Sequence, residues 1–122
     1  MRVKDALGRF GEEVATRHLS AAGLVILDRN WRCADGEIDI VAQDGRALVF
    51  CEVKTRSSMT FGLPAEAVTP IKARRIRGLA LTWLVEHRGE SSAYWPLLRF
   101  DVISVLRRYG EPPLVDHLPD AF

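Results

Sequence analysis

A β-hairpin predicted between residues 36 and 54 constrains the fold of this 122-residue chain more than any other feature. Two segments alternate apolar and polar residues, GEIDIVAQ (36–43) and ALVFCEVK (47–54), and Asp44-Gly45 lies between them. An Asp-Gly pair between two alternating segments is a strong hairpin signal, because both residues tolerate the positive φ angles of a tight turn. We therefore expect two neighbouring antiparallel strands.

The register of this hairpin decides which side chains share a face. A two-residue turn at Asp44-Gly45 pairs Gln43 with Arg46 and places Glu37 opposite Glu52. Opposed residues point to the same face, and so do residues two apart in one strand. One face then carries four charged residues, namely Glu37, Asp39, Glu52 and Lys54. Asp39 and Glu52 would be diagonal neighbours, whereas a turn with one extra residue would separate the set.

Three carboxylates and one lysine give this face a formal charge of −2. Two carboxylates about 5 Å apart repel by roughly 3 kcal/mol at an effective dielectric of 20. Lys54 relieves part of this repulsion, so we expect either a protonated acid with a raised pKa or a bound cation. Oxygen ligands alone suit Mg²⁺ or Mn²⁺. The alternative is a solvated strand face, but the flanking segments read as covered strands, where unpaired charge is costly.

The other predicted elements surround the hairpin. In chain order they are a helix from an Asp5 N-cap to about Ala22 with Gly23 as its stop, a buried strand at 24–28, a helix from Thr69-Pro70 to about Glu86, and a strand at 98–106. The order is α-β-β-β-α-β. On the first helix, Glu12 continues the inward stripe of Ala15 and Leu19, whereas Glu13 faces solvent with Arg17.

Composition excludes several classes of protein. With 48% hydrophobic and 27% charged residues, the chain is typical of a globular domain rather than a disordered one. It holds no apolar run near the roughly 18 residues of a membrane span, and its N-terminal segment turns acidic where a signal peptide would carry an apolar stretch. We therefore expect a cytoplasmic protein rather than a secreted one. Cys33 and Cys51 lack metal-binding spacing and are expected to be reduced thiols.

Charge is distributed unevenly along the chain. The net charge is +1, but residues 111–122 contain three acidic and no basic residues. We therefore divide the chain into a domain at 1–110 and an acidic C-terminal tail at 111–122. The tail is expected to be a loosely ordered extension.

These motifs resemble the PD-(D/E)xK nuclease superfamily, which includes the restriction endonucleases. More closely, the chain resembles the small bacterial YraN-type family, which is similar in pattern to archaeal Holliday-junction resolvases. The matching segments are Gly8, GEEVA (11–15), RNWR (29–32), GEIDIVA (36–42), VFCEVKTR (49–56), FGLPAEAV (61–68), Lys72 and RFDVI (99–103). The resemblance implies an α/β fold of the restriction-endonuclease type, with a central mixed sheet flanked by helices.

The resemblance also implies a catalytic site. Asp39 and Glu52 would bind Mg²⁺ or Mn²⁺, with the Val53 carbonyl as a further ligand. Lys54 would orient or help to deprotonate the attacking water, and Glu12 would complete the acidic cluster, which also contains Glu37. Ile38 stands where the family motif has proline, a departure that removes no ligand.

Four basic residues are the candidate phosphate contacts: Arg56, Lys72, Arg32 and Arg75. Lys72 belongs to the first turn of the second helix, where backbone N–H groups attract anions. A basic outer face of an amphipathic helix is the alternative for its arginines. Trp31 either stacks on a base or anchors packing, and Asp101 either approaches the acidic cluster or pairs with an arginine.

Three functions follow as hypotheses. The first is a metal-dependent endonuclease that acts on DNA rather than RNA, including branched or structured DNA. The second is a non-catalytic nucleic-acid-binding module of the same fold. The third is an assembly protein whose acidic cluster is a structural salt network. Junction cutting needs two active sites, so a homodimer is a further expectation, and no membrane partner is expected.

Overall fold

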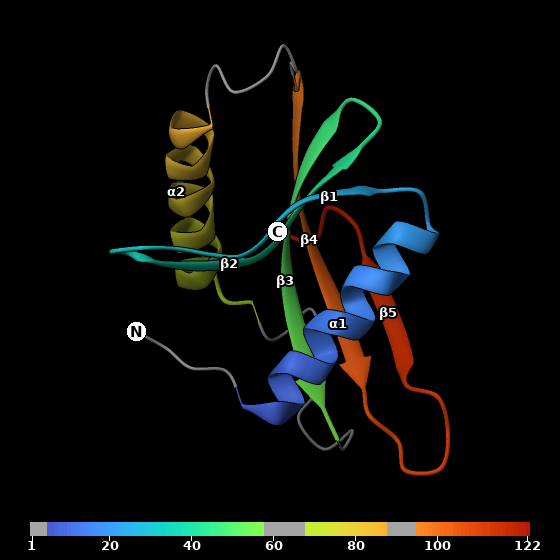
Figure 1. Ribbon diagram of the computed structural model, residues 1–122. Helices are drawn as coiled ribbons and strands as arrows, with labels where there is room; N and C mark the ends of the chain where they lie inside the picture. The colour runs from blue at the N-terminus through green and yellow to red at the C-terminus, as the bar shows by residue number, and fades with distance from the viewer. Residues whose placement is uncertain (1–4, 58–67, 88–94) are drawn as a thin grey trace.

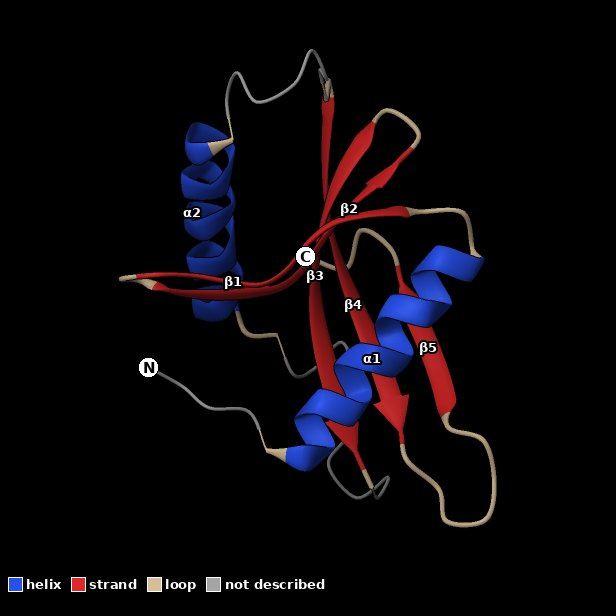
Figure 2. Ribbon diagram, viewed as in Figure 1, coloured by secondary structure: helices blue, strands red, loops and turns tan. Residues whose placement is uncertain are grey.

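The fold is a mixed sheet with one helix on each face, as Figures 1 and 2 show. The computed structural model describes residues 5–57, 68–87 and 95–122. Its elements are α1 (Ala6–Ala21), β1 (Val25–Cys33), β2 (Gly36–Asp44), β3 (Ala47–Arg56), α2 (Pro70–Glu86), β4 (Leu97–Leu106) and β5 (Leu114–Leu118). This order confirms the α-β-β-β-α-β core and adds a strand after it. The FGLPAEAV segment lies outside the described residues except for its last valine.

The strand order across the sheet follows the chain order, β1-β2-β3-β4-β5. β3 and β4 are parallel, and the other neighbours are antiparallel. The parallel pair needs a long connection between its strands, which includes α2. The expected mixed sheet flanked by helices is therefore confirmed.

Both helices begin where their capping residues predict. The Asp5 side chain accepts a hydrogen bond from the Gly8 N–H at 2.7 Å, and the Thr69 side chain accepts one from the Lys72 N–H at 3.2 Å. Gly23 follows α1 with a φ of +96°, a conformation that glycine adopts without steric cost. Local capping chemistry thus sets the position of both helices along the chain.

The β2–β3 turn is shifted from the predicted position. Asp44 pairs with Ala47 and Gln43 with Leu48, so the two loop residues are Gly45 and Arg46 rather than Asp44 and Gly45. Gly45 has a φ of +59°, as the first loop position of a type II′ turn requires. The register moves by two residues, and the side-chain period of a strand is two. The predicted face is therefore retained.

The strand predicted at 24–28 as buried is longer than expected and lies at the sheet edge. β1 runs from Val25 to Cys33, and exposed and half-buried residues alternate along most of it. Its RNWR motif belongs to the strand rather than to a following loop. An edge strand has a neighbour on one side only, which explains why its apolar residues do not all become buried.

Two apolar clusters hold the helices to the sheet. Ala15 and Leu19 of α1 pack with Ile40 and Cys51 on one face. On the other face α2 contributes Trp83, which contacts the ring of Phe50 at a centroid distance of 5.9 Å. Both aromatic side chains are buried in the core.

The C-terminal segment contains a strand, so the expectation of a loosely ordered tail is wrong. β5 pairs with β4 from Val102↔Leu118 to Leu106↔Leu114. Within β5, exposed Leu114 and Asp116 alternate with half-buried Val115 and His117, a pattern that the charge count did not take into account. Within the described part of the chain, neither helix has the length and apolarity needed to cross a membrane.

Candidate functional site

The candidate site lies where β2 and β3 separate. Ile40–Asp44 of β2 pairs with Ala47–Cys51 of β3. Beyond the Ile40–Cys51 pair, the rest of β2 lies beside β1 alone, and the rest of β3 lies beside β4. Figure 1 shows the β1–β2 pair bending away from β3 toward α2. At the fork, Asp39 Oδ2 accepts a hydrogen bond of 2.8 Å from the Val53 N–H. The Asp39 carboxylate thus accepts a hydrogen bond from a β3 backbone N–H that lies beyond the last β2–β3 residue pair.

A cleft of about 800 Å³ opens at this fork. Residues of α1, β1, β2, β3 and α2, together with the β1–β2 turn, line it. Every predicted site residue except Arg56 is among them: Glu12, Arg32, Glu37, Asp39, Glu52, Val53, Lys54, Lys72 and Arg75. Arg56 ends β3 outside the cleft, where its carbonyl accepts a hydrogen bond from the Arg107 N–H at 2.7 Å.

Two lysines share one oxygen of Glu52. Lys54 Nζ lies 3.1 Å and Lys72 Nζ 2.8 Å from Glu52 Oε1, and the Glu52 side chain is only 14% exposed. Lys54 comes from the same strand, whereas Lys72 comes from the first turn of α2. The sequence predicted Lys72 as a phosphate contact, and its ion pair with Glu52 was not foreseen.

This arrangement changes the pKa values of all three groups. Burial acts to raise the pKa of Glu52, but the hydrogen bonds and charges of Lys72 and then Lys54 outweigh it, so the pKa is lowered. Burial, followed by the nearby Lys72, lowers the pKa of Lys54. Burial opposes a rise in the pKa of Lys72, but its bond to Glu52 raises it overall. Glu52 is therefore ionised, and Lys54 loses its proton more readily than Lys72.

The first helix presents its two adjacent glutamates in opposite directions. Glu12 is buried with 4% exposure and lines the cleft. Glu13 faces outward and pairs with Arg17 at 3.2 Å and Arg29 at 3.1 Å. The helix phase predicted from the apolar stripe is confirmed.

Hydrogen bonds join β1, in the β1–β2 hairpin at the edge of the cleft, to α2. Trp31 Nε1 donates to Glu86 at 3.0 Å, and Trp83 Nε1 donates to Asp28 at the same distance. These contacts support packing rather than base stacking as the role of Trp31. Across the same hairpin, Arg32 pairs with Glu37 at 3.3 Å.

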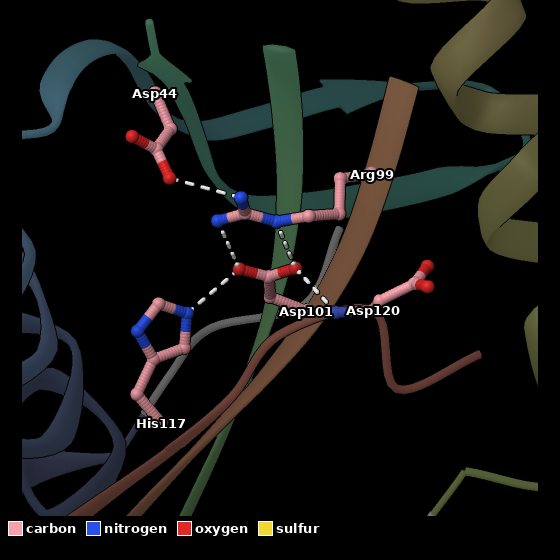
Figure 3. Close-up of polar contacts among 5 residues, drawn as sticks. All are labelled: Asp44, Arg99, Asp101, His117 and Asp120. Atoms are coloured by element: carbon pink, nitrogen blue, oxygen red, sulfur yellow. Dashed lines mark hydrogen bonds and ion pairs between the residues drawn. The ribbon is translucent and has the colours of Figure 1, made fainter. Parts of the chain in front are cut away.

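Asp101 belongs to a separate network on the α1 face of the sheet (Figure 3). It is fully buried and stands beside Cys51 in the β3–β4 register. Arg99 binds it through two bonds of 2.9 Å, His117 Nε2 lies 2.7 Å away, and the Asp120 N–H donates at 3.0 Å. Of the two predicted alternatives, pairing with an arginine is correct. The i, i+2 spacing of Arg99 and Asp101 on one strand was the available signal.

Comparison with known proteins places the chain in a family. A model described as Uncharacterised protein family UPF0102 matches residues 11–105, a range that contains every candidate site residue. The chain belongs to the UPF0102 family. It is 60% identical over 122 residues to a UPF0102 protein of Frankia casuarinae, with both chains fully covered. A UPF0102 protein of Acidothermus cellulolyticus is 50% identical over 125 residues, covering 98% of this chain and 95% of the relative.

Membership of UPF0102 confirms the expected relationship to a small bacterial family. In this UPF0102 chain, no group of three or more His, Cys, Asp or Glu side chains among residues 5–57, 68–87 and 95–122 converges as a ready metal cage. The cleft is lined by the carboxylates of Glu12, Glu37, Asp39 and Glu52, so a cation bound there would take its remaining ligands from water or substrate.

Proposed function

We propose that this UPF0102 protein is a metal-dependent endonuclease of the PD-(D/E)xK type that hydrolyses phosphodiester bonds of DNA. The convergence of Asp39, Glu52 and Lys54 where two strands separate carries this proposal, because it brings two carboxyl groups and a lysine into one cleft. Lys72 and Arg75 line the same cleft and add positive charge that a phosphate backbone would need. The resemblance of the VFCEVKTR and GEIDIVA motifs supports the same chemistry.

The donor set fits Mg²⁺ or Mn²⁺. Asp39 and Glu52 would bind the cation, with the Val53 carbonyl as a further ligand. Glu52 already accepts two ammonium groups on one oxygen, which supports its capacity to bind positive charge. When bound, a divalent cation would supply a water of lowered pKa and a counter-charge for the phosphate. Lys72 would have to release Glu52 or share it.

The protein's own side chains have separate roles in this proposal. Lys54, whose pKa is lowered, would orient the attacking water and accept or share its proton. Lys72, whose pKa is raised, would keep its charge and bind a substrate phosphate. Glu12 would complete the acidic cluster from α1. We place this activity in the cytoplasm, with branched or structured DNA as the preferred substrate.

A second candidate function is a structural salt network without catalysis. The two ion pairs of Glu52 favour it, because they balance the charge of this acid without a metal ion. A non-catalytic nucleic-acid-binding module of the same fold is the remaining alternative. Cation binding and strand cleavage distinguish the three.

Calorimetry with Mn²⁺ and a cleavage assay on single-stranded, duplex, flap and four-way DNA test the proposal. We expect weak Mn²⁺ binding that Asp39→Asn or Glu52→Gln abolishes. Lys54→Ala should abolish cleavage and leave Mn²⁺ binding and thermal stability close to those of the unchanged protein. Glu12→Gln should lower cleavage, whereas Glu13→Gln, on the outer side of the same helix turn, should not.

The opposite results would support the other candidates. Unchanged Mn²⁺ binding after both carboxylate substitutions would show that the site is assigned wrongly. A large loss of stability in Lys54→Ala, without any Mn²⁺ binding by the unchanged protein, would favour the salt network. DNA binding without cleavage of any substrate would favour the binding module.

A further inference from the structure

Lys72 of α2 is the closer of the two ammonium groups at Glu52. Its Nζ lies 2.8 Å from Glu52 Oε1, compared with 3.1 Å for Lys54 Nζ. Burial acts to lower the pKa of Lys72, but the bond to Glu52 and the charge of Asp39 help to raise it overall. The ammonium group of Lys72 thus interacts with both carboxylates that we propose as metal ligands. One positive charge already balances the two acids that a divalent cation would bind.

The position of Lys72 in α2 is unfavourable for a cation. Lys72 lies in the first turn, where its N–H donates to the Thr69 cap, and that turn contains no acidic residue. The helix dipole places partial positive charge at this end, so it repels a lysine and attracts an anion. Glu52 supplies an anion from β3. If another cation takes Glu52, Lys72 needs a new anionic partner near the same place.

The two members of this ion pair differ in their freedom to move. The Glu52 side chain is 14% exposed and comes from a strand with β4 along its whole length. The Lys72 side chain is 34% exposed and lines the cleft. A lysine carries its charge on a flexible aliphatic stem. The ammonium group of Lys72 can therefore leave Glu52 and turn into the cleft while the backbone of α2 stays in place.

We propose that Lys72 and the metal ion occupy Glu52 alternately, and that Lys72 transfers to a substrate phosphate when it gives up Glu52. This inference rests on the proposed nuclease function and concerns the regulation of its site. Without a divalent cation, Lys72 is held by Glu52 and is withdrawn from DNA. With the cation bound, Lys72 is released to the phosphate backbone. Cation and DNA therefore strengthen each other's binding, each by the same factor.

Calorimetry with Mn²⁺ in the absence of DNA tests the alternation. Lys72→Met removes the ammonium group and keeps an unbranched side chain with good helix propensity, so the fold is retained. We expect the dissociation constant for Mn²⁺ to fall by roughly tenfold, because the ion no longer displaces a hydrogen-bonded charge from Glu52. A lysine that serves only to stabilise the fold would not produce tighter Mn²⁺ binding when it is removed.

Arg75→Met is the matched control. Arg75 lines the same cleft on the next turn of α2, and no ion pair joins it to Glu52 in the part of the chain that the structure describes. Its exposed charge is screened by salt, so this variant should change the Mn²⁺ dissociation constant by at most about twofold. Equal tightening in both variants would show a general repulsion by positive charge and would overturn the alternation.

DNA binding tests the transfer of Lys72 to phosphate. Fluorescence anisotropy of a labelled duplex with phosphorothioate linkages, which resist cleavage, is measured with and without Mn²⁺. We expect Mn²⁺ to tighten binding of the duplex to the unchanged protein, and to do so much less in Lys72→Met. The same gain in both proteins would show that Lys72 does not transfer to phosphate.

The results separate this inference from the proposed function. Mn²⁺ binding that Asp39→Asn abolishes and Lys72→Met leaves unchanged, or weakens, would overturn the alternation and leave the proposed metal site standing. Mn²⁺ binding by Lys72→Met alone would support the alternation in its strongest form. Mn²⁺ binding by neither the unchanged protein nor Lys72→Met would overturn both.

Discussion

Two buried acids of this chain obtain their counter-charges in different ways. Asp101 is fully enclosed and receives donors from Arg99, His117 and the Asp120 backbone. Glu52 lies at a cleft and receives two lysine ammonium groups on one oxygen. The first carboxylate has fixed partners from two adjacent strands and the chain after β5. The second has long, flexible partners that can move when a ligand enters, which is the behaviour expected at a binding site.

Asp101→Asn should destabilise the protein far more than Asp44→Asn. Both acids bind Arg99, but Asp101 is buried and the Asp44 side chain is 45% exposed. Removing one partner of a buried ion pair costs about 3–5 kcal/mol, whereas a surface pair is worth about 1 kcal/mol or less. Denaturant unfolding of the two variants at neutral pH measures the difference. Equal losses of unfolding free energy would contradict the structural role assigned to Asp101.

At the scale of elements, Gly11 sets the distance between α1 and β3. A Cβ built at this position would collide with the side chain of Thr55. The close approach places the following residue, Glu12, into the cleft beside β3. One glycine in a helix thus positions an acid contributed from outside the hairpin.

Gly11→Ala and Gly78→Ala should change stability in opposite directions. At Gly11 the added methyl group overpacks the contact with Thr55, and we expect a loss of about 1–3 kcal/mol. At Gly78 the space is open and the position is inside α2, so alanine should stabilise the protein by up to about 1 kcal/mol. Thermal unfolding of the two variants measures both changes. A stabilising Gly11→Ala would show that α1 does not lie this close to β3.

Local signals predicted the elements and the shared face of the site. Asp5 and Thr69 marked the helix starts, because capping depends on a few adjacent residues. The hairpin register was wrong by two residues, yet the face was right, because strand side chains alternate with a period of two.

Long-range contacts could not be read from the same signals. The pairing of Lys72 with Glu52 depends on where α2 packs, and nothing in its local sequence specifies that position. β5 was missed because the charge of residues 111–122 suggested solvation, whereas its ladder to β4 depends on a strand that lies earlier in the chain. The role of Asp101 follows from that same contact.

At the scale of the whole molecule, the C-terminal segment completes the sheet. β5 pairs with the free edge of β4. After β5, the Ala121 N–H donates a hydrogen bond of 2.8 Å to the Phe100 carbonyl. His117 and the Asp120 N–H reach Asp101 from the same segment. Residues 111–122 therefore belong to the fold.

Removal of residues 111–122 should destabilise the protein strongly. The deletion exposes the β4 edge and takes two donors away from a fully buried carboxylate, which together should cost at least about 3 kcal/mol. Thermal unfolding of the truncated chain, beside a His117→Ala variant that removes one donor only, measures this loss. A truncated chain that unfolds at the temperature of the full chain would contradict the structural role of β5 and agree with the expectation of a loosely ordered tail.

The parallel pairing of β3 with β4 has a consequence for the order of assembly. Forty residues separate Arg56 from Leu97, whereas two residues close the β2–β3 hairpin. Short hairpins form in microseconds, while closing a long loop costs more chain entropy and comes later in folding. Asp39 and Glu52 are both in the hairpin, and Lys72 arrives with the crossover connection. We therefore expect Asp39 and Glu52 to come together before Lys72 reaches Glu52. Their mutual repulsion should then destabilise an early stage of folding more than it destabilises the native protein.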